Sequence, residues 1–394
     1  MKDLLLYVHV PFCPSKCHFC AWVKSVPVRD LRLDESDGPR RAYVDAVCDQ
    51  IRTAAPKLNQ AGYRPKLMYW GGGTPSALTV REFTRIMDTL RESFDLSALT
   101  EVTTESSPDT LTEEKLAAYK AAGFTRVSIG VQSFDPDRLR RVARSHTPDD
   151  ARTAPRLASA AGFQEINVDL MCGMPDESLD EIERSVVTAT ELPITHVSLY
   201  PYAPASGTVT YRQLEKGWGT IDRKERKRAY QLGRTILQDR GFPEYSMSYF
   251  GRTPCEVDLA YYRLTMDWIG FGPGASSIVD RKFALMHEQL ASYVADPNQP
   301  RVASPASAES LSSTFLFEGL GTFSGVSAAR WQERLGYSLD WVLDHSIQYG
   351  LIQYLTRFGG LIRDEVGIRL PRERIAPMLI DLTGRLTPAA GWSG

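Results

Sequence analysis

Short apolar runs rich in β-branched and aromatic residues alternate with helical patterns over the first half of the chain. The runs predicted to be strands are 4–10, 66–70, 100–105, 126–131, 164–170 and 195–200. The helical patterns between them cover 40–61, 79–94, 112–122, 148–161 and 178–191. Strands that alternate with helices pair in parallel through crossover connections. We therefore expect an α/β fold, a partial (β/α)6 barrel of the TIM type, followed by a small C-terminal α/β domain.

Each predicted strand runs into a polar or glycine-rich feature at its carboxyl end, where β/α barrels collect functional residues. These features are the cysteine-rich segment after Val10, Gly71-Gly72-Gly73-Thr74, Glu105, Gln132, Asp169 and Tyr202-Ala203. The glycines could serve only a turn, and the two carboxylates could be solvated strand ends or helix caps. At one mouth of a barrel, glycines also admit a ligand close to the backbone, and carboxylates can hold ribose hydroxyls or an ammonium group.

Cys13, Cys17 and Cys20 stand in a C-x3-C-x2-C spacing directly after the first predicted strand. Three soft thiolates suit an iron–sulfur cluster. A cubane cluster has four irons, so one iron would lack a protein ligand and stay open to an exogenous one. We expect the chemistry of the protein at that open iron.

Zinc and disulfides are the alternatives for these cysteines. Structural zinc needs four ligands, and the remaining cysteines are isolated, so His9 or His18 would have to complete the shell by chance of geometry. Six cysteines in 394 residues are too sparse for a disulfide framework, and no secretory segment precedes them. Both alternatives are weaker than the cluster.

The charge balance argues against polyanionic partners. The chain has 46 Lys and Arg against 48 Asp and Glu, a net charge of −2, which gives no electrostatic case for nucleic acid or an anionic membrane. The apolar run at the N-terminus is too short to span a bilayer and is interrupted by His9 and Pro11. We expect a cytoplasmic protein in a reducing compartment.

The second half of the chain is less regular. Residues 222–240 read as an amphipathic helix whose Arg and Lys side chains form a solvated face rather than a substrate patch. An aromatic group could line a pocket for a flat conjugated substrate, although large aromatics more often pack in a core: Tyr245, Tyr249, Tyr261, Tyr262 and Trp268. A Pro/Ala/Ser-rich boundary is expected at 297–310, then helices at 309–318, 327–335 and 339–348 and a strand pair near 361–370.

Several segments together resemble the radical S-adenosylmethionine (SAM) enzymes, in the HemN-like branch that includes oxygen-independent coproporphyrinogen oxidase and the heme chaperone HemW. They are YVHVPFCPSKCHFC, YWGGGTPS, TTESSPDTL, RVSIGVQSFD, ARSHTP, NVDLMCGMP and DWIGFGPGASS. They occur in family order from residue 4 to about 280. The resemblance implies a radical SAM core barrel over 1–205, a barrel extension over 206–296 and a HemN-like C-terminal domain over 297–394.

The resemblance also implies cofactors and their residues. A 4Fe–4S cluster on Cys13, Cys17 and Cys20 would bind one SAM and cleave it reductively to methionine and a 5′-deoxyadenosyl radical. Tyr7, Gly72 and Glu105 match positions that contact this SAM. A second SAM is implied by Phe19, Gly73, Thr74, Gln132, Arg144, Asp169 and Ala203. Ser276 stands where related chains carry a hydrophobic or histidine contact to the first SAM.

Departures from the family pattern shape the expected function. Trp22 replaces a further cysteine of the porphyrin-oxidising members, and CAW and GASS replace the CDF and GAHS of HemW-like chaperones. The group that matches best uses two SAM molecules for C-methylation or cyclopropanation of an unsaturated natural product. We therefore expect that activity, on a small unsaturated substrate, with flavodoxin or ferredoxin as reductant. The alternatives are a HemW-like heme chaperone, oxygen-independent coproporphyrinogen oxidase and a radical heme-degrading enzyme.

Overall fold

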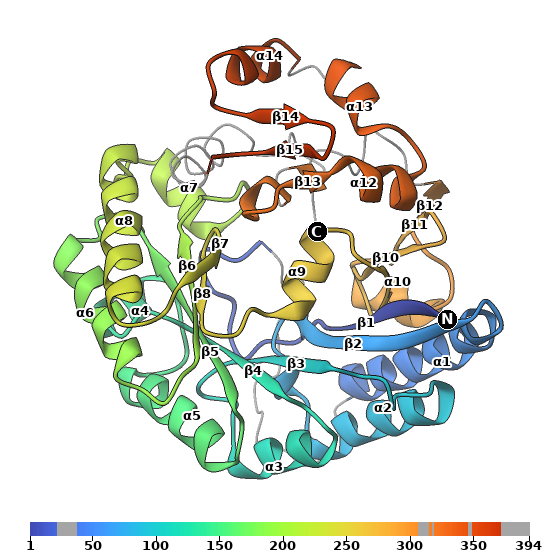
Figure 1. Cartoon of the computed structure of the whole chain (residues 1–394). Helices are drawn as coiled ribbons and strands as arrows, with labels where there is room; N and C mark the ends of the chain where they lie inside the picture. Colours follow the sequence, from blue (N-terminus) through green and yellow to red (C-terminus); the bar gives the residue numbers. More distant parts are fainter. Residues whose placement is uncertain (22–37, 306–314, 317–318, 346–348, 372–394) are drawn as a thin grey trace.

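A computed structural model of the chain describes residues 1–21, 38–305, 315–316, 319–345 and 349–371. Twelve strands form one curved, mixed sheet in the order β12-β11-β10-β9-β1-β2-β3-β4-β5-β6-β8-β7 (Figure 1). Its centre consists of parallel strands β1 (Lys2–Val10), β2 (Tyr63–Gly72), β3 (Glu101–Ser106), β4 (Arg126–Gln132), β5 (Glu165–Cys172) and β6 (His196–Pro201). These are the six predicted strands. The fold is a partial β/α barrel, as predicted.

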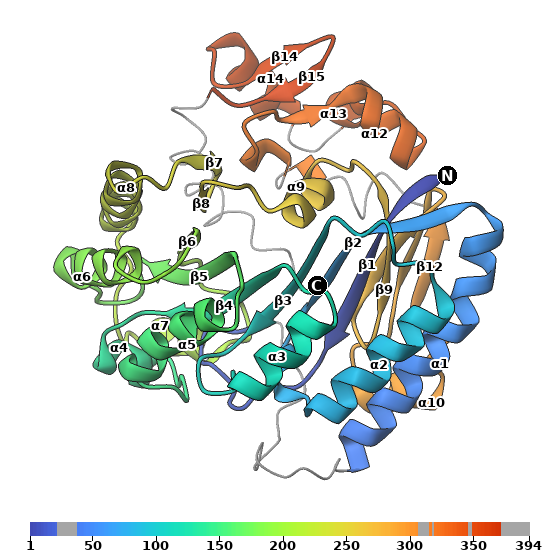
Figure 2. The ribbon, with the colours of Figure 1, turned by 60° about the horizontal axis from the view of Figure 1, so that its bottom comes forward.

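Helices cover the outer face of this sheet (Figure 2). They are α1 (Gly38–Gln60), α2 (Val80–Ser93), α3 (Glu113–Ala121), α5 (Pro148–Ala160) and α6 (Leu179–Thr190), which match the predicted helices, and the short α4 (Pro136–Arg141), which was not predicted. Three of the predicted helices begin with a capping box, in which a Ser or Thr side chain and an acidic side chain three residues later bind each other's backbone N–H groups. The N-termini are therefore fixed by local sequence.

The sheet continues beyond the six predicted strands on both sides. β9 (Asp267–Phe271) pairs in parallel with β1, and β10 (Ser276–Val279), β11 (Lys282–Leu285) and β12 (Val302–Pro305) follow it as antiparallel strands. On the opposite edge, β8 (Tyr249–Gly251) pairs antiparallel with β6, and β7 (Glu244–Ser246) with β8. In the part of the chain that the structure describes, β12 and β7 do not pair, so the barrel stays open.

The remaining helices of the large unit are α7 (Val209–Glu215), α8 (Arg223–Asp239), α9 (Glu256–Tyr262) and α10 (Leu290–Ala295). α8 is the predicted basic helix. Arg223, Lys224 and Arg228 are exposed on it, whereas Arg226 is buried and donates a hydrogen bond to the Tyr202 carbonyl oxygen at 3.0 Å. α9 lies on the inner side of the curved sheet (Figure 1).

The C-terminal part forms a small three-stranded sheet with helices, as expected. It contains β13 (Val326–Ser327), α12 (Ala328–Leu335), α13 (Leu339–His345), α14 (Tyr349–Arg357), β14 (Ile362–Asp364) and β15 (Gly367–Arg369). Most of the predicted helix at 309–318, residues 346–348 and Trp22 lie outside the described residues. The domain limits remain a prediction, although β12 joins residues 302–305 of the predicted 297–310 boundary to the large sheet.

One apolar cluster connects the two parts. It combines Leu5, Leu67 and Trp268 of the large sheet with Trp331 and Leu343 of the C-terminal part. Among the described residues, no helix has the length and apolar character needed to cross a bilayer.

Candidate functional site

The strands alternate apolar and polar side chains, and this alternation builds the site. In β5, Ile166, Val168 and Leu170 are buried in the main apolar core, while Asn167 and Asp169 line an internal cavity. β3 and β6 follow the same period of two. The outward side chains pack in the apolar core with the helices. The inward side chains face the cavity and can therefore be polar.

The three cysteines of the predicted cluster site lie on the loop after β1, at the carboxyl end of the strand. Cys13 and Cys17 are buried, and Cys20 is half-buried. Thr74 Oγ1 lies 3.3 Å from Cys13 Sγ, and Arg144 donates a hydrogen bond to Cys17 Sγ at 3.3 Å. Burial raises the pKa of the Cys13 thiol to about 12, with further increases from the neighbouring cysteine thiols, while Thr74 and Arg144 oppose the shift.

This loop fits an iron–sulfur cluster by the chemistry of its donors. Three thiols interact with one another on one short loop, and a guanidinium beside them can offset thiolate charge. Within the described residues, no three Cys, His, Asp or Glu side chains converge tightly enough to hold a single metal ion. A cubane spreads its thiolates over different irons, so such convergence is not required.

The glycine run brings the end of β2 against the cysteine loop. The Gly73 N–H donates to the Val10 carbonyl oxygen at 2.7 Å, and a Cβ at Gly73 would lie 2.6 Å from the Phe12 carbonyl oxygen. Gly72 has φ +105°, and a Cβ there would lie 2.6 Å from the His9 ring. These positions need glycine because backbone and side chains of the first strand and loop fill the space.

Other residues matched to the second SAM gather near the same loop. Gln132, at φ 70°, and Arg144 both reach Gly130, since a Cβ there would lie 3.1 Å and 3.3 Å from their side-chain nitrogens. Phe19 packs against a buried group that includes Tyr202, the neighbour of Ala203. Ser276 begins β10 against Gly270 and is not among the cavity residues. Their roles as SAM contacts remain predictions.

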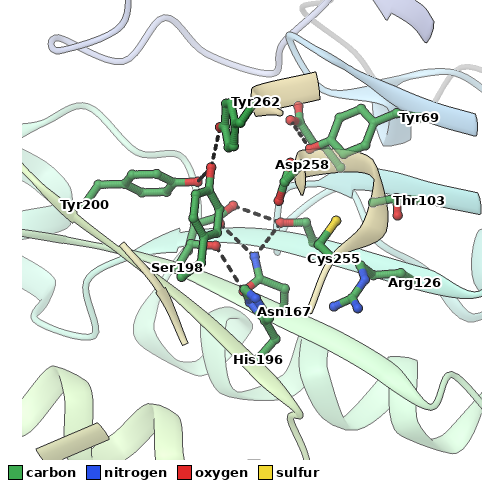
Figure 3. Close-up of a pocket in the computed structure, with 14 residues that line it drawn as sticks. Tyr69, Thr103, Arg126, Asn167, His196, Ser198, Tyr200, Cys255, Asp258 and Tyr262 are labelled. Carbon is green, nitrogen blue, oxygen red and sulfur yellow. Dashed lines mark hydrogen bonds between the residues drawn. The ribbon is translucent and has the colours of Figure 1, made fainter. Parts of the chain in front are cut away.

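A cavity of about 180 Å³ lies inside the barrel (Figure 3). Its lining consists of Tyr69, Thr103, Glu105, Arg126, Ser128, Asn167, Asp169, His196, Ser198, Tyr200, Tyr249, Cys255, Asp258 and Tyr262. Glu105 and Asp169 are the predicted site residues among them. Glu105 is the penultimate residue of β3, and Asp169 lies three residues before the end of β5.

Glu105 is held from two sides. Tyr69 donates its hydroxyl to Oε1 at 2.6 Å, and the Gly72 N–H donates to Oε2 at 3.1 Å. Burial raises the pKa of Glu105 to about 7, against the effect of these hydrogen bonds. Tyr7 stacks on Tyr69 with ring centroids 6.2 Å apart, and its hydroxyl lies 3.0 Å from His9 Nδ1. A bound ammonium group would suit this carboxylate and would lower its pKa again.

Asp169 is the second carboxylate of the cavity. Asn167 donates to its Oδ1 at 2.8 Å and Ser128 to its Oδ2 at 3.1 Å. Burial raises the pKa of Asp169, and these hydrogen bonds and Arg144 act in the opposite direction. Each carboxylate oxygen retains acceptor capacity for a ligand hydroxyl or ammonium.

Sequence reasoning named Tyr262 among the aromatic pocket candidates but missed Cys255 and Asp258, the other residues that α9 and its N-cap bring to the cavity. Cys255, Asp258 and Tyr262 reach the cavity from its N-cap and from successive turns of one face. Burial raises the pKa of Asp258 to about 7. The i, i+3, i+7 spacing of these residues was the available signal, but it becomes informative only once α9 is known to enter the barrel.

Two buried charges fix α9 in place. The Glu101 carboxylate accepts from the Glu256 N–H at 3.1 Å, the Val257 N–H at 3.4 Å and Cys255 Sγ at 3.1 Å. Arg126 pairs with Glu101 at 3.5 Å and donates to the Thr253 and Pro254 carbonyl oxygens at 3.4 and 3.3 Å. Glu101 and Arg126 therefore form a clamp on residues 253–257.

The predicted aromatic group is divided between pocket and core. Tyr249 and Tyr262 line the cavity, and their hydroxyls lie 2.6 Å apart. Tyr261 and Trp268 belong to the apolar cluster shared with the C-terminal part. Tyr245 is not among the lining residues, but its hydroxyl contacts the lining residue His196.

Comparison with known proteins agrees with this arrangement. The profile of the family described as "Radical SAM superfamily" matches residues 7–189. The heme chaperone HemW of Bacillus subtilis is 31% identical over 381 residues, covering 91% of this chain and 97% of that protein. HemW of Escherichia coli is 31% identical over 280 residues, covering 70% of each chain.

A bovine mitochondrial protein named radical S-adenosyl methionine domain-containing protein 1 is 28% identical and covers 98% of this chain and 88% of its own length. Among solved structures, coproporphyrinogen III oxidase (HemN) from Escherichia coli superposes with a TM-score of 0.76 at 23% identity, covering 98% of this chain and 90% of that one. That likeness shows a shared fold.

Proposed function

The chain belongs to the HemN/HemW-like branch of the radical SAM superfamily, and on this premise we propose that it cleaves SAM reductively and acts in heme handling. The observation that carries SAM cleavage is the three-thiol loop, against which the glycine run packs while Gly72 of that run donates to the cavity residue Glu105. When bound, a 4Fe–4S cluster supplies the electron that splits SAM into methionine and a 5′-deoxyadenosyl radical.

The residues of the chain have separate tasks in this proposal. Cys13, Cys17 and Cys20 would hold three irons, and Arg144 would balance thiolate charge. Glu105, held by Tyr69 and Gly72, would accept hydrogen bonds from an ammonium group. The barrel interior would limit the access of water to a reactive radical.

Heme is the proposed cargo because the relatives with high coverage are named heme chaperones. The cavity of about 180 Å³ is smaller than usual ligand pockets, which span roughly 300–1,000 Å³. We therefore propose that heme binds outside this cavity, and that SAM, which is also larger than the cavity, extends only in part into it.

C-methylation or cyclopropanation with a second SAM is the second candidate. It is favoured by Thr74 and Arg144, which match second-SAM positions and each lie 3.3 Å from a thiol of the cysteine loop. The names of the reported relatives favour heme handling instead. C-methylation or cyclopropanation is therefore supported by Thr74 and Arg144 but not by the names of the relatives.

Anaerobic reconstitution of the cluster tests whether the chain cleaves SAM. Iron and sulfide are added to the wild-type chain, to Cys17→Ser and to Cys48→Ser, a buried cysteine of α1 outside the loop. Dithionite and SAM are then supplied, and methionine and 5′-deoxyadenosine are quantified. We expect product from wild type and Cys48→Ser and at least a tenfold loss in Cys17→Ser. No product from a fully loaded wild-type chain would refute SAM cleavage.

Heme is titrated in parallel by absorbance. Stoichiometric, saturable binding supports heme handling, and its absence removes it. With candidate substrates and methyl-deuterated SAM, deuterium in 5′-deoxyadenosine and formation of S-adenosylhomocysteine would support the second candidate instead.

A further inference from the structure

His196, the first residue of β6, lies buried between the cavity and Tyr245. Its exposed fraction is 2%, and both ring nitrogens have a close partner. Nδ1 lies 2.6 Å from Asn167 Oδ1, and Nε2 lies 2.6 Å from the Tyr245 hydroxyl. Figure 3 shows His196 and Asn167 side by side at the floor of the cavity.

The direction of these hydrogen bonds follows from the carboxylate of Asp169. An ionised carboxylate only accepts, so the atom of Asn167 that lies 2.8 Å from Asp169 Oδ1 is the amide nitrogen. The oxygen of Asn167 then faces His196, and Nδ1 must carry the proton. Nε2 is therefore the acceptor, and the Tyr245 hydroxyl donates to it.

The chain of bonds extends to α9. The Cys255 N–H, at the N-cap of the helix, donates to the Tyr245 oxygen at 3.2 Å. All bonds thus point the same way, from Cys255 through Tyr245, His196 and Asn167 to Asp169. Burial holds the pKa of His196 well below its usual range, aided by Arg126, so the ring keeps one proton and one acceptor.

We infer that His196 is a positioning residue, which orients Asn167 and thereby the Asp169 carboxylate toward a ligand that carries hydroxyl or ammonium donors, and which links that carboxylate to α9. The oxygen of Asn167 has a second, longer donor, Ser198 Oγ at 3.2 Å, so turning the imidazole or losing the Tyr245 donor would remove the shorter of its two hydrogen bonds. The Asn167 amide would then be held less firmly against Asp169, while Ser128 would keep its bond to the other carboxylate oxygen. A ligand on Asp169 and a group that moves α9 are consequently coupled through His196.

The first test does not depend on SAM. The six histidines of the cluster-free chain are labelled with ¹⁵N, and the tautomers are read by long-range ¹H–¹⁵N correlation. His196→Asn identifies the signal. We expect the Nδ1–H tautomer for His196 between pH 6 and 8. The Nε2–H tautomer or a tautomer mixture would overturn the inference.

The second test measures SAM affinity by equilibrium dialysis on the reconstituted protein, and it rests on the proposed SAM binding. Tyr245→Phe removes the donor to Nε2, and we expect roughly a tenfold rise in Kd. Tyr293→Phe is the matched control, because the Tyr293 hydroxyl also makes a buried 2.6 Å bond, to Gln50, away from the cavity. Equal Kd values for both variants would refute coupling to the ligand.

A double-mutant cycle separates positioning from general destabilisation. His196→Leu and Asp169→Asn are each expected to raise the Kd for SAM about tenfold, and the double variant no further than either alone. His196→Asn, which keeps a donor near Nδ1, should recover part of the affinity. Additive effects would show that His196 acts independently of Asp169. If the wild-type protein does not bind SAM at all, the proposed function fails. The His196 tautomer then still tests whether the hydrogen-bond chain has the inferred direction.

Discussion

Residues packed against the cysteine loop tolerate little change in side-chain size, and Gly73 has the closest contacts with the backbone of that loop. A Cβ at Gly73 would lie 2.6 Å from the Phe12 carbonyl oxygen and 2.9 Å from that of Val10. Both contacts are with backbone, so Gly73→Ala must displace the cysteine loop. We predict at least a tenfold loss of iron and sulfide bound after reconstitution. Gly38→Ala, with no atom of the described residues within 4 Å of the new Cβ, is the control and should load normally.

Asp258 should make the stability of the chain depend on pH. Its pKa is raised from 3.8 to about 7 in the folded state, chiefly by burial. Between these values the folded chain binds a proton that the unfolded chain has lost, so the free energy of unfolding falls as pH rises from about 4 to 7. In Asp258→Asn we predict a smaller fall, with a gain of about 2 kcal/mol over wild type at pH 8.

Urea unfolding of the cluster-free chain at pH 5 and pH 8 measures this difference. Because Glu105 also has a raised pKa, some pH dependence should persist in the variant. An identical slope in wild type and variant would mean that Asp258 is ionised well below neutral pH.

The sequence places Glu105, Asp169 and the cysteines on or directly after strands that are predictable from their apolar residues, and their roles as site residues stay predictions. Asn167 lies two residues before Asp169 on β5, His196 is the first residue of β6, and both side chains line the cavity. The period of two indicates their direction, but their roles follow from hydrogen bonds between different strands. No local pattern carries that information.

Among the elements, α9 depends most on contacts distant in sequence. Its N-terminus is capped by Glu101 of β3, and that carboxylate pairs with Arg126 of β4. Breaking a buried pair costs about 3–5 kcal/mol. For Glu101→Gln we predict amide exchange about 100-fold faster at Glu256 and Val257, measured by hydrogen–deuterium exchange.

Glu181→Gln is the matched control for this prediction. Glu181 also combines helix capping, through Ser178 at the start of α6, with a buried partner, Arg138 at 3.1 Å. Its substitution should accelerate exchange in α6 and leave α9 unchanged. Faster exchange in α9 in both variants would indicate general loosening instead of a local clamp.

Elements with their own sequence signals were predicted well, and elements that depend on a distant partner were not. α2, α5 and α6 carry their capping boxes within a few residues. β9 becomes a parallel neighbour of β1 only through the register Leu4↔Asp267, across most of the chain. Its run DWIGF is short, and the period alone does not reveal which edge it joins.

At the scale of the whole molecule, the two parts share one apolar cluster and several polar contacts. Trp331 of α12 is fully buried in that cluster, and Arg334 pairs with Asp267 of β9 at 3.1 Å. We predict that Trp331→Ala lowers the free energy of unfolding by about 4 kcal/mol. Calorimetry should show one transition that moves to lower temperature. A new, separate transition for the C-terminal part would contradict the shared core.

The positions of the six cysteines in the chain have a practical consequence. Cys48 and Cys172 have no exposed surface and Cys255 has 3%, and each lies in a different element. Only the loop between residues 13 and 20 holds neighbouring thiols. If exposure to air removes the cluster, oxidation of cysteine is therefore expected mainly in the eight residues from 13 to 20. Mass spectrometry of the peptide that contains these residues would measure how far a preparation has been oxidised.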